Sequence, residues 1–149
     1  MCLYKIGSDM TRICVDATVW HLQPYPVVVT TDISEISPLY STTESLIVFA
    51  GHLPVHPDST DPICLAWNYS EVLSILQSHR SVVCFMAGHD HDGGYHRDAS
   101  GIHYLTLEGV IETPPESNAF GTMHVYADRM VLKGNGRISD RVLAYPGNL

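Results

Sequence analysis

"LIVFAGH" at residues 46–52 and "VVCFMAGH" at residues 82–89 are the two stretches that decide the fold. Each begins with a continuous apolar run, which is typical of a strand buried on both faces of a parallel sheet. Between them a helical pattern begins at Asn68, where Glu71 follows at capping-box spacing, and ends near Arg80. Strand, helix and strand in this order predict a βαβ unit, with two parallel strands joined by a right-handed crossover.

The segment after this unit alternates between apolar and polar residues. The alternation covers residues 102–109, 121–127 and 129–134, with a tight turn at residues 127–128. This period of two predicts antiparallel strands with one buried face. The chain is therefore expected to be an α/β protein in which a parallel portion continues into an antiparallel one.

Residues 1–44 differ from the rest of the chain. Their short apolar pieces are broken by Pro, Ser and Thr and show no sustained period, so little can be placed there beyond one or two possible strands. We expect two parts, a divergent N-terminal segment over residues 1–44 and a domain portion over residues 45–149.

The composition excludes several classes of partner. The formal net charge is −8 and Lys and Arg together number eight, whereas binding to a nucleic-acid backbone needs clustered basic residues. No apolar run approaches the roughly 18 residues of a membrane span. A basic segment followed by an apolar one, as in a signal peptide, is also missing from the first thirty residues. We therefore expect a cytoplasmic protein without nucleic-acid or membrane partners.

Histidines follow both predicted buried strands. The two strands end in the same Ala-Gly-His sequence, at His52 and His89, and His91 comes two residues later. Neighbouring parallel strands lie about 4.8 Å apart, so these imidazoles should emerge at one carboxyl edge of the sheet. The repeated ending predicts a metal site formed by the three histidines. The alternative is that each is a hydrogen-bonded structural histidine, which is the commoner role of a lone His at a strand end.

Other residues near this edge leave alternatives open. Trp67 and Asn68 begin the crossover helix and are candidates for substrate binding, although Trp67 could equally fill the core. Asp90 and Asp92 could bind the metal as well, but on this Gly-rich loop they are expected to support the ligands without touching the ion, or to be solvated. The segment that holds Glu112 could be a substrate loop or an ordinary connection. His56, His96, His103 and His124 are expected to be surface or strand-face residues.

Two of these stretches also resemble a known family. "GHLPVH" at residues 51–56 and "AGHDH" at residues 87–91 resemble the last two histidine blocks of the calcineurin-like metallophosphoesterases. The resemblance extends over residues 45–143 and is greatest to a branch that hydrolyses the diphosphate bond of nucleoside diphosphate derivatives, such as ADP-ribose and CDP-alcohols. It implies that the chain is the C-terminal portion of an α/β/β/α sandwich. It also implies a small-molecule partner and a monomeric complete form.

The resemblance also implies a cofactor and a mechanism. Two divalent ions are expected, Mn²⁺ by family with Zn²⁺ as the alternative, and His52 and His89 would bind one ion while His91 binds the other. A metal-bridged hydroxide would attack a phosphorus atom, and no catalytic residue beyond the metal ligands is assigned.

The family's earlier blocks have no counterpart in this sequence, which contains no Gly-Asp dipeptide. We therefore expect a truncated form that is weakly active or inactive alone. The alternative is a non-catalytic metal-binding or interaction fragment. A cupin-like barrel using the "HDH" stretch is less favoured, because no glutamate follows it at the required spacing.

Overall fold

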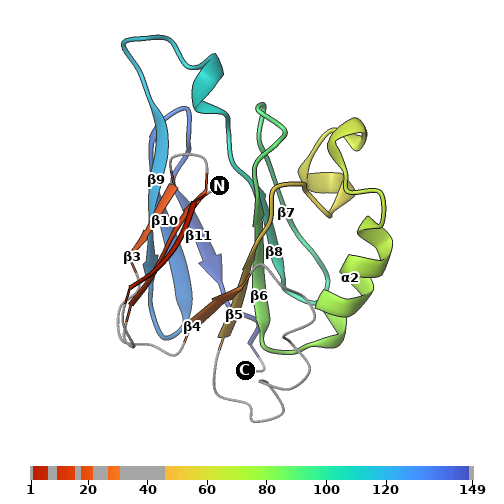
Figure 1. Cartoon of the computed structure of the whole chain (residues 1–149). Helices are drawn as coiled ribbons and strands as arrows, with labels where there is room; N and C mark the ends of the chain where they lie inside the picture. The colour runs from red at the N-terminus through yellow and green to blue at the C-terminus, as the bar shows by residue number, and fades with distance from the viewer. Residues whose placement is uncertain (1, 7–9, 16–17, 22–26, 31–45, 148–149) are drawn as a thin grey trace.

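The computed structural model shows a six-stranded and a five-stranded β-sheet packed face to face. The α-helix that the structure describes lies on the outer face of the five-stranded sheet (Figure 1). The structure describes residues 2–6, 10–15, 18–21, 27–30 and 46–147. Helix, sheet and sheet therefore form three layers in this part of the chain, and the expected α/β class with mixed sheets is confirmed.

The predicted βαβ unit lies in a five-stranded sheet with the order β4-β5-β6-β8-β7. Its strands β5 and β6 have the predicted bounds and are parallel neighbours, with Phe49 opposite Phe85. The connection between them contains two short 3₁₀ helices, η2 and η3, and then helix α2. The bounds are β4 Val27–Thr30, β5 Leu46–Ala50, η2 Pro57–Ser59, η3 Pro62–Cys64, α2 Tyr69–Ser78, β6 Val82–Ala87, β7 Gly94–Arg97 and β8 His103–Thr106.

Two strands of this sheet differ from the prediction. Strand β8 was expected to be antiparallel with one buried face, but it is parallel to β6 and all four of its residues are buried. It is a central strand, so both of its faces are covered: Tyr104 packs on the helix side and Leu105 on the side of the other sheet. Strand β7, which pairs antiparallel with β8 at the sheet edge, was not predicted because its sequence "GYHR" is short and mostly polar.

The other sheet has the order β1-β2-β3-β9-β10-β11. The predicted hairpin of β9 and β10 is confirmed, and its turn is closed by the Tyr126 N–H, which donates to the Arg129 carbonyl at 2.8 Å. Strand β9 alternates between buried and less buried residues, as its sequence predicts. The bounds are β1 Cys2–Ile6, β2 Met10–Val15, β3 Thr18–His21, β9 Ala119–Val125, β10 Arg129–Gly136 and β11 Arg141–Ala144.

Residues 1–44 contain more strands than the one or two that could be placed from sequence, because the structure has β1, β2, β3 and β4 there. Strands of four to six residues span too few positions to show a period. Strands β3 and β4 also pair with partners outside that segment, β9 and β5, which local sequence cannot reveal.

The residues of β5 alternate between two hydrophobic cores. Val48 packs in the core between the sheets, whereas Ile47 and Phe49 face α2 together with Leu76, whose side chain is fully buried. Because both faces are covered, the whole strand is apolar. Burying one such side chain contributes roughly 1.5–3 kcal/mol. The partly buried Tyr69, Val72 and Leu73 of α2 pack against the same core.

Helix α2 begins after Asn68, the predicted N-cap position, but the Asn68 side chain makes no capping hydrogen bond. The helix ends at Ser78, two residues before the predicted end. Within the described residues, no helix has both the length and the apolar character needed to cross a membrane.

Candidate metal centre

The carboxyl ends of β5 and β6 bring two histidines together. Backbone hydrogen bonds continue past both strands, from the Gly51 N–H to the Met86 carbonyl at 2.8 Å and from the Gly88 N–H to the His52 carbonyl at 3.2 Å. This keeps the two loops in register, so His52 Nε2 lies 3.1 Å from His89 Nδ1. The prediction that His52 and His89 meet at one edge of adjacent parallel strands is confirmed.

The geometry of this pair suits a shared cation. The rings meet edge to face, with centroids 4.9 Å apart and planes inclined by 72°. Two ligand nitrogens of one ion, with bonds of about 2.1 Å, lie about 3.0–3.4 Å apart at the usual bond angles. The observed separation falls in that range, so one divalent ion could contact both nitrogens with small side-chain movements.

The backbone of His89 adopts an unusual conformation. Its φ of 66° lies in the left-handed region, which costs a non-glycine residue of order 1–3 kcal/mol unless the surroundings enforce it. The next residue supplies that constraint, because the Asp90 N–H donates to the Gly88 carbonyl at 2.8 Å. Such strain is concentrated at functional sites, which agrees with a role for His89 there.

Asp90 holds the loop that carries His89 and His91 in place. Its carboxylate is buried and accepts hydrogen bonds from the Thr60 hydroxyl at 2.7 Å, the Asp61 N–H at 2.8 Å and the Asp92 N–H at 3.1 Å. Burial alone would raise the pKa of Asp90, but these hydrogen bonds and nearby His89 outweigh it and lower the pKa overall. Asp90 therefore ties the histidine loop to the η2–η3 segment. The Asp92 side chain, by contrast, is almost fully exposed.

His91 is oriented by a carboxylate that sequence reasoning did not assign. Its Nδ1 lies 2.7 Å from Glu112 Oε1, on the 3₁₀ helix η4 (Val110–Glu112). A Cβ atom at Gly109 would lie 2.7 Å from His91 Cγ and 2.8 Å from Glu112 Oε2, so only glycine allows this approach. A carboxylate on one ring nitrogen is the usual partner of a metal-binding histidine and leaves Nε2 for the ion.

All three predicted histidines line one cavity of about 320 Å³. They do not meet at a single point. Within the described part of the chain, the one group of three metal-binding side chains whose ligand atoms all lie within 4.8 Å of one another is elsewhere, at His56, Asp58 and His96. The lining residues of the cavity are His52, Gly88, His89, His91, Leu107, Gly109, Val110 and Ile111.

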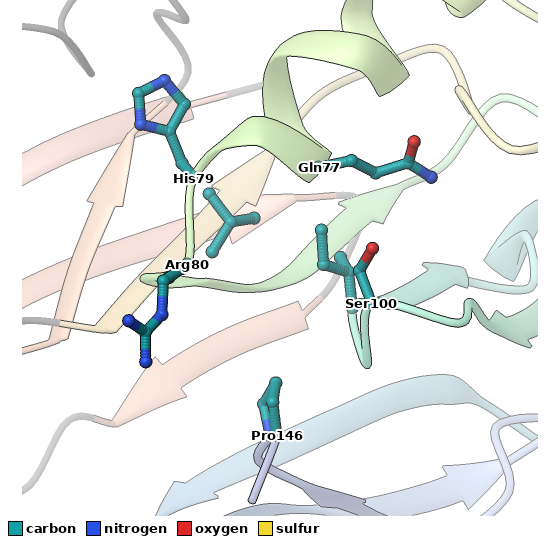
Figure 2. Close-up of a pocket in the computed structure, with 7 residues that line it drawn as sticks. Gln77, His79, Arg80, Ser100 and Pro146 are labelled. Carbon is teal, nitrogen blue, oxygen red and sulfur yellow. The ribbon is translucent and has the colours of Figure 1, made fainter. Parts of the chain in front are cut away.

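A second cavity of about 260 Å³ lies at the opposite end of β6, beside its first residue, Val82. Figure 2 shows side chains from the end of α2, from Ser100 and from Pro146 around it. None of the predicted site residues lines this cavity, so the candidate site is the histidine cavity. The lining residues are Gln77, His79, Arg80, Val82, Ser100, Ile102 and Pro146.

The two candidate substrate residues lie outside the histidine cavity. Trp67 is fully exposed, so the alternative in which it fills the core is wrong. Asn68 is exposed as well, at the start of α2. Neither residue is among those that line the cavity, and their part in substrate binding stays a prediction.

Comparison with known proteins identifies the class. No protein-family profile matches the chain. The structure is similar to the crystal structure of a dimetal phosphatase from Danio rerio, with a TM-score of 0.68 and 58% sequence identity over 69% of this chain and 33% of that one. The described fold is therefore that of part of a dimetal phosphatase.

Sequence comparison gives the particular relatives, all named manganese-dependent ADP-ribose/CDP-alcohol diphosphatase. The mouse protein is 52% identical over 113 residues, covering 76% of this chain and 33% of the relative. The Xenopus tropicalis protein is 63% identical over 102 residues, covering 68% and 30% respectively. The chain spans about a third of the length of these relatives. Over that part it is homologous to this enzyme group, which confirms the resemblance expected from its two histidine blocks.

Proposed function

We propose that the chain supplies the histidine part of a dimetal centre that hydrolyses the diphosphate bond of nucleoside diphosphate derivatives, such as ADP-ribose and CDP-alcohols. The observation that carries this proposal is the His52–His89 pair, with its nitrogens 3.1 Å apart, in one cavity with His91. Mn²⁺ is the proposed cofactor because the relatives are named as manganese-dependent. The predicted monomeric state and cytoplasmic location stay predictions.

The donor set fits divalent cations. His52 Nε2 and His89 Nδ1 would hold one ion in place of the proton that they share, while His91, with its Nδ1 engaged by Glu112, would offer Nε2 to the second. Bound ions of this kind polarise a phosphoryl oxygen and lower the pKa of a coordinated water. The protein contributes the orientation of the imidazoles, through the hydrogen bonds of Asp90 and Glu112.

The charge of the cavity explains why cations are needed. None of the eight residues that line it is Lys or Arg, and the chain carries a formal charge of −8. Among the described residues, the one basic group that the hydrogen bonds place beside the lining is the Arg137 guanidinium, which donates to the Gly109 carbonyl at 3.3 Å. Bound cations would supply the attraction for a diphosphate group, and the exposed Val110 and Ile111 would contact the less polar parts of a substrate. Trp67, fully exposed near the start of α2, is the proposed stacking partner for a nucleobase.

A second candidate function is metal binding without efficient catalysis. No Asp or Glu is among the lining residues, although a bridging carboxylate normally offsets the repulsion between two ions about 3.5–4 Å apart. The sequence also contains no Gly-Asp dipeptide. We propose that this chain alone hydrolyses ADP-ribose slowly. Because its donors are imidazoles, it should also bind Zn²⁺ more tightly than Mn²⁺.

An assay of ADP-ribose hydrolysis with added Mn²⁺ separates the two candidates. The unmodified chain is compared with His89→Ala and with a matched control, His124→Ala, which removes an exposed histidine from β9. Hydrolysis lost in His89→Ala but kept in His124→Ala supports a catalytic centre. If both variants and the parent release product at the rate of buffer alone, the chain is not catalytic by itself.

A further inference from the structure

We propose that His56, Asp58 and His96 form a second metal-binding site that takes a borderline divalent ion such as Zn²⁺. One ligand atom from each lies within 4.8 Å of the other two. None of these residues lines the histidine cavity, so the site is independent of the proposed function. The bound ion would fasten the loop after β5 to the edge strand β7.

The close approach of two backbones creates this cluster. A Cβ atom at Gly94 would overlap the Ser59 carbonyl group, so glycine is required for β7 to pack against η2. His96 lies two residues after Gly94 and therefore on the same side of the strand. Its Nδ1 reaches to 3.8 Å from Asp58 Oδ2, and its ring stacks on that of His56 with centroids 4.1 Å apart.

His56 is already held in position for ligation. It is buried, its ring lies against Tyr104 with centroids 4.6 Å apart, and its Nδ1 accepts a hydrogen bond from the Asp58 N–H at 3.2 Å. This hydrogen bond places a lone pair on Nδ1, so ligation through that atom needs no change of tautomer. A metal–nitrogen bond to His56 Nδ1 would then replace the 3.2 Å hydrogen bond from the Asp58 N–H.

The other two ligands have room to adjust. The Asp58 and His96 side chains are 68% and 32% exposed, so each can rotate without disturbing the core. Metal–ligand bonds of about 2.0–2.2 Å require the three atoms to draw closer than 4.8 Å, and these two side chains would have to move to bring this about. Water would complete the coordination on the exposed side.

The chemistry of the three side chains suits a borderline divalent ion. Burial and the neighbouring His96 lower the pKa of His56, while Asp58 and Asp98 act in the opposite direction. An imidazole must be neutral to bind a metal. Two imidazoles and one carboxylate are a donor set that suits Zn²⁺ better than Mn²⁺.

The test is calorimetric titration of the chain with Zn²⁺. The variant titrated lacks the three histidines of the histidine cavity, through His52→Ala, His89→Ala and His91→Ala together. This background is expected to bind one Zn²⁺ through the second cluster. Adding His96→Ala should weaken that binding at least tenfold, and adding Asp58→Asn should weaken it as well. Adding His124→Ala, the matched exposed histidine, should leave it unchanged.

Two further measurements keep the test decisive. Circular dichroism checks that each variant is folded, and Asp58→Asn changes a mostly exposed side chain in case His96→Ala unfolds. The visible spectrum of Co²⁺, used as a probe for Zn²⁺, should show a bound-ion band that disappears with His96→Ala. Failure of the folded background to bind Zn²⁺, or equal binding with and without His96, would overturn the proposal and leave a metal-free stacked pair.

Discussion

Replacing Glu112 tests whether its carboxylate orients the His91 imidazole for metal binding. The Glu112→Ala change removes the carboxylate that lies 2.7 Å from His91 Nδ1 and leaves the imidazole free to rotate. Both side chains are about half exposed, 48% for His91 and 47% for Glu112, so their contact contributes about 0.2–1 kcal/mol to stability at most. The variant should therefore fold normally.

Metal affinity should respond more strongly than stability. Removing the carboxylate partner of a metal-binding histidine costs about 10–100-fold in affinity, and the exposure of this pair favours the lower end. A tenfold loss corresponds to about 1.4 kcal/mol. The metal affinity of Glu112→Gln should fall between those of the parent and Glu112→Ala, because an amide oxygen can still accept a hydrogen bond from the His91 N–H but carries no charge.

The measurement is the Kd for Mn²⁺ and Zn²⁺ by calorimetry at fixed pH. His91→Ala provides the full loss of the ligand, and Glu116→Ala removes another exposed carboxylate from the same segment as a control. If the Kd of Glu112→Ala for metal is within twofold of the parent value while His91→Ala binds one ion fewer, the carboxylate does not orient the histidine. Loss of affinity in Glu116→Ala would point to a general charge effect instead.

Three further predictions concern stability and substrate. Burial lowers the pKa of His103 despite its hydrogen bond to the Ala144 carbonyl, so its protonation favours unfolding. The free energy of unfolding should fall as pH drops below about 6.5, less steeply in His103→Gln. Leu76→Ala should cost about 2–5 kcal/mol in chemical denaturation, because Leu76 is fully buried between α2 and the sheet. Trp67→Ala should change stability by less than about 0.5 kcal/mol but weaken ADP-ribose binding measured by calorimetry.

The part of the fold that was predictable depends on strands buried on both faces. The apolar runs of β5 and β6 permit little else, and their bounds agree with the structure. Strand β8 was misassigned because two polar residues, His103 and Thr106, interrupt the continuous apolar run that would mark a strand buried on both faces. Both are buried, and His103 is accommodated by hydrogen bonds to the Tyr95 hydroxyl and the Ala144 carbonyl. Such tertiary partners cannot be inferred from a local pattern.

The candidate site was predictable to the same extent. His52 and His89 follow directly from the two strands, so their meeting could be derived from strand pairing alone. Glu112 could not be derived, because its contact with His91 depends on the conformation of η4 and on the absence of a side chain at Gly109. The pairing of His56 with His96 likewise depends on β7, an edge strand that the sequence does not signal.

The most direct test of the account is a crystal structure of the protein grown with Mn²⁺, with anomalous diffraction recorded at the manganese edge. We predict an anomalous peak about 2.1 Å from both His52 Nε2 and His89 Nδ1, the two atoms that lie 3.1 Å apart. Fully occupied Mn²⁺ bound elsewhere, with His52 and His89 still hydrogen-bonded to each other, would contradict it.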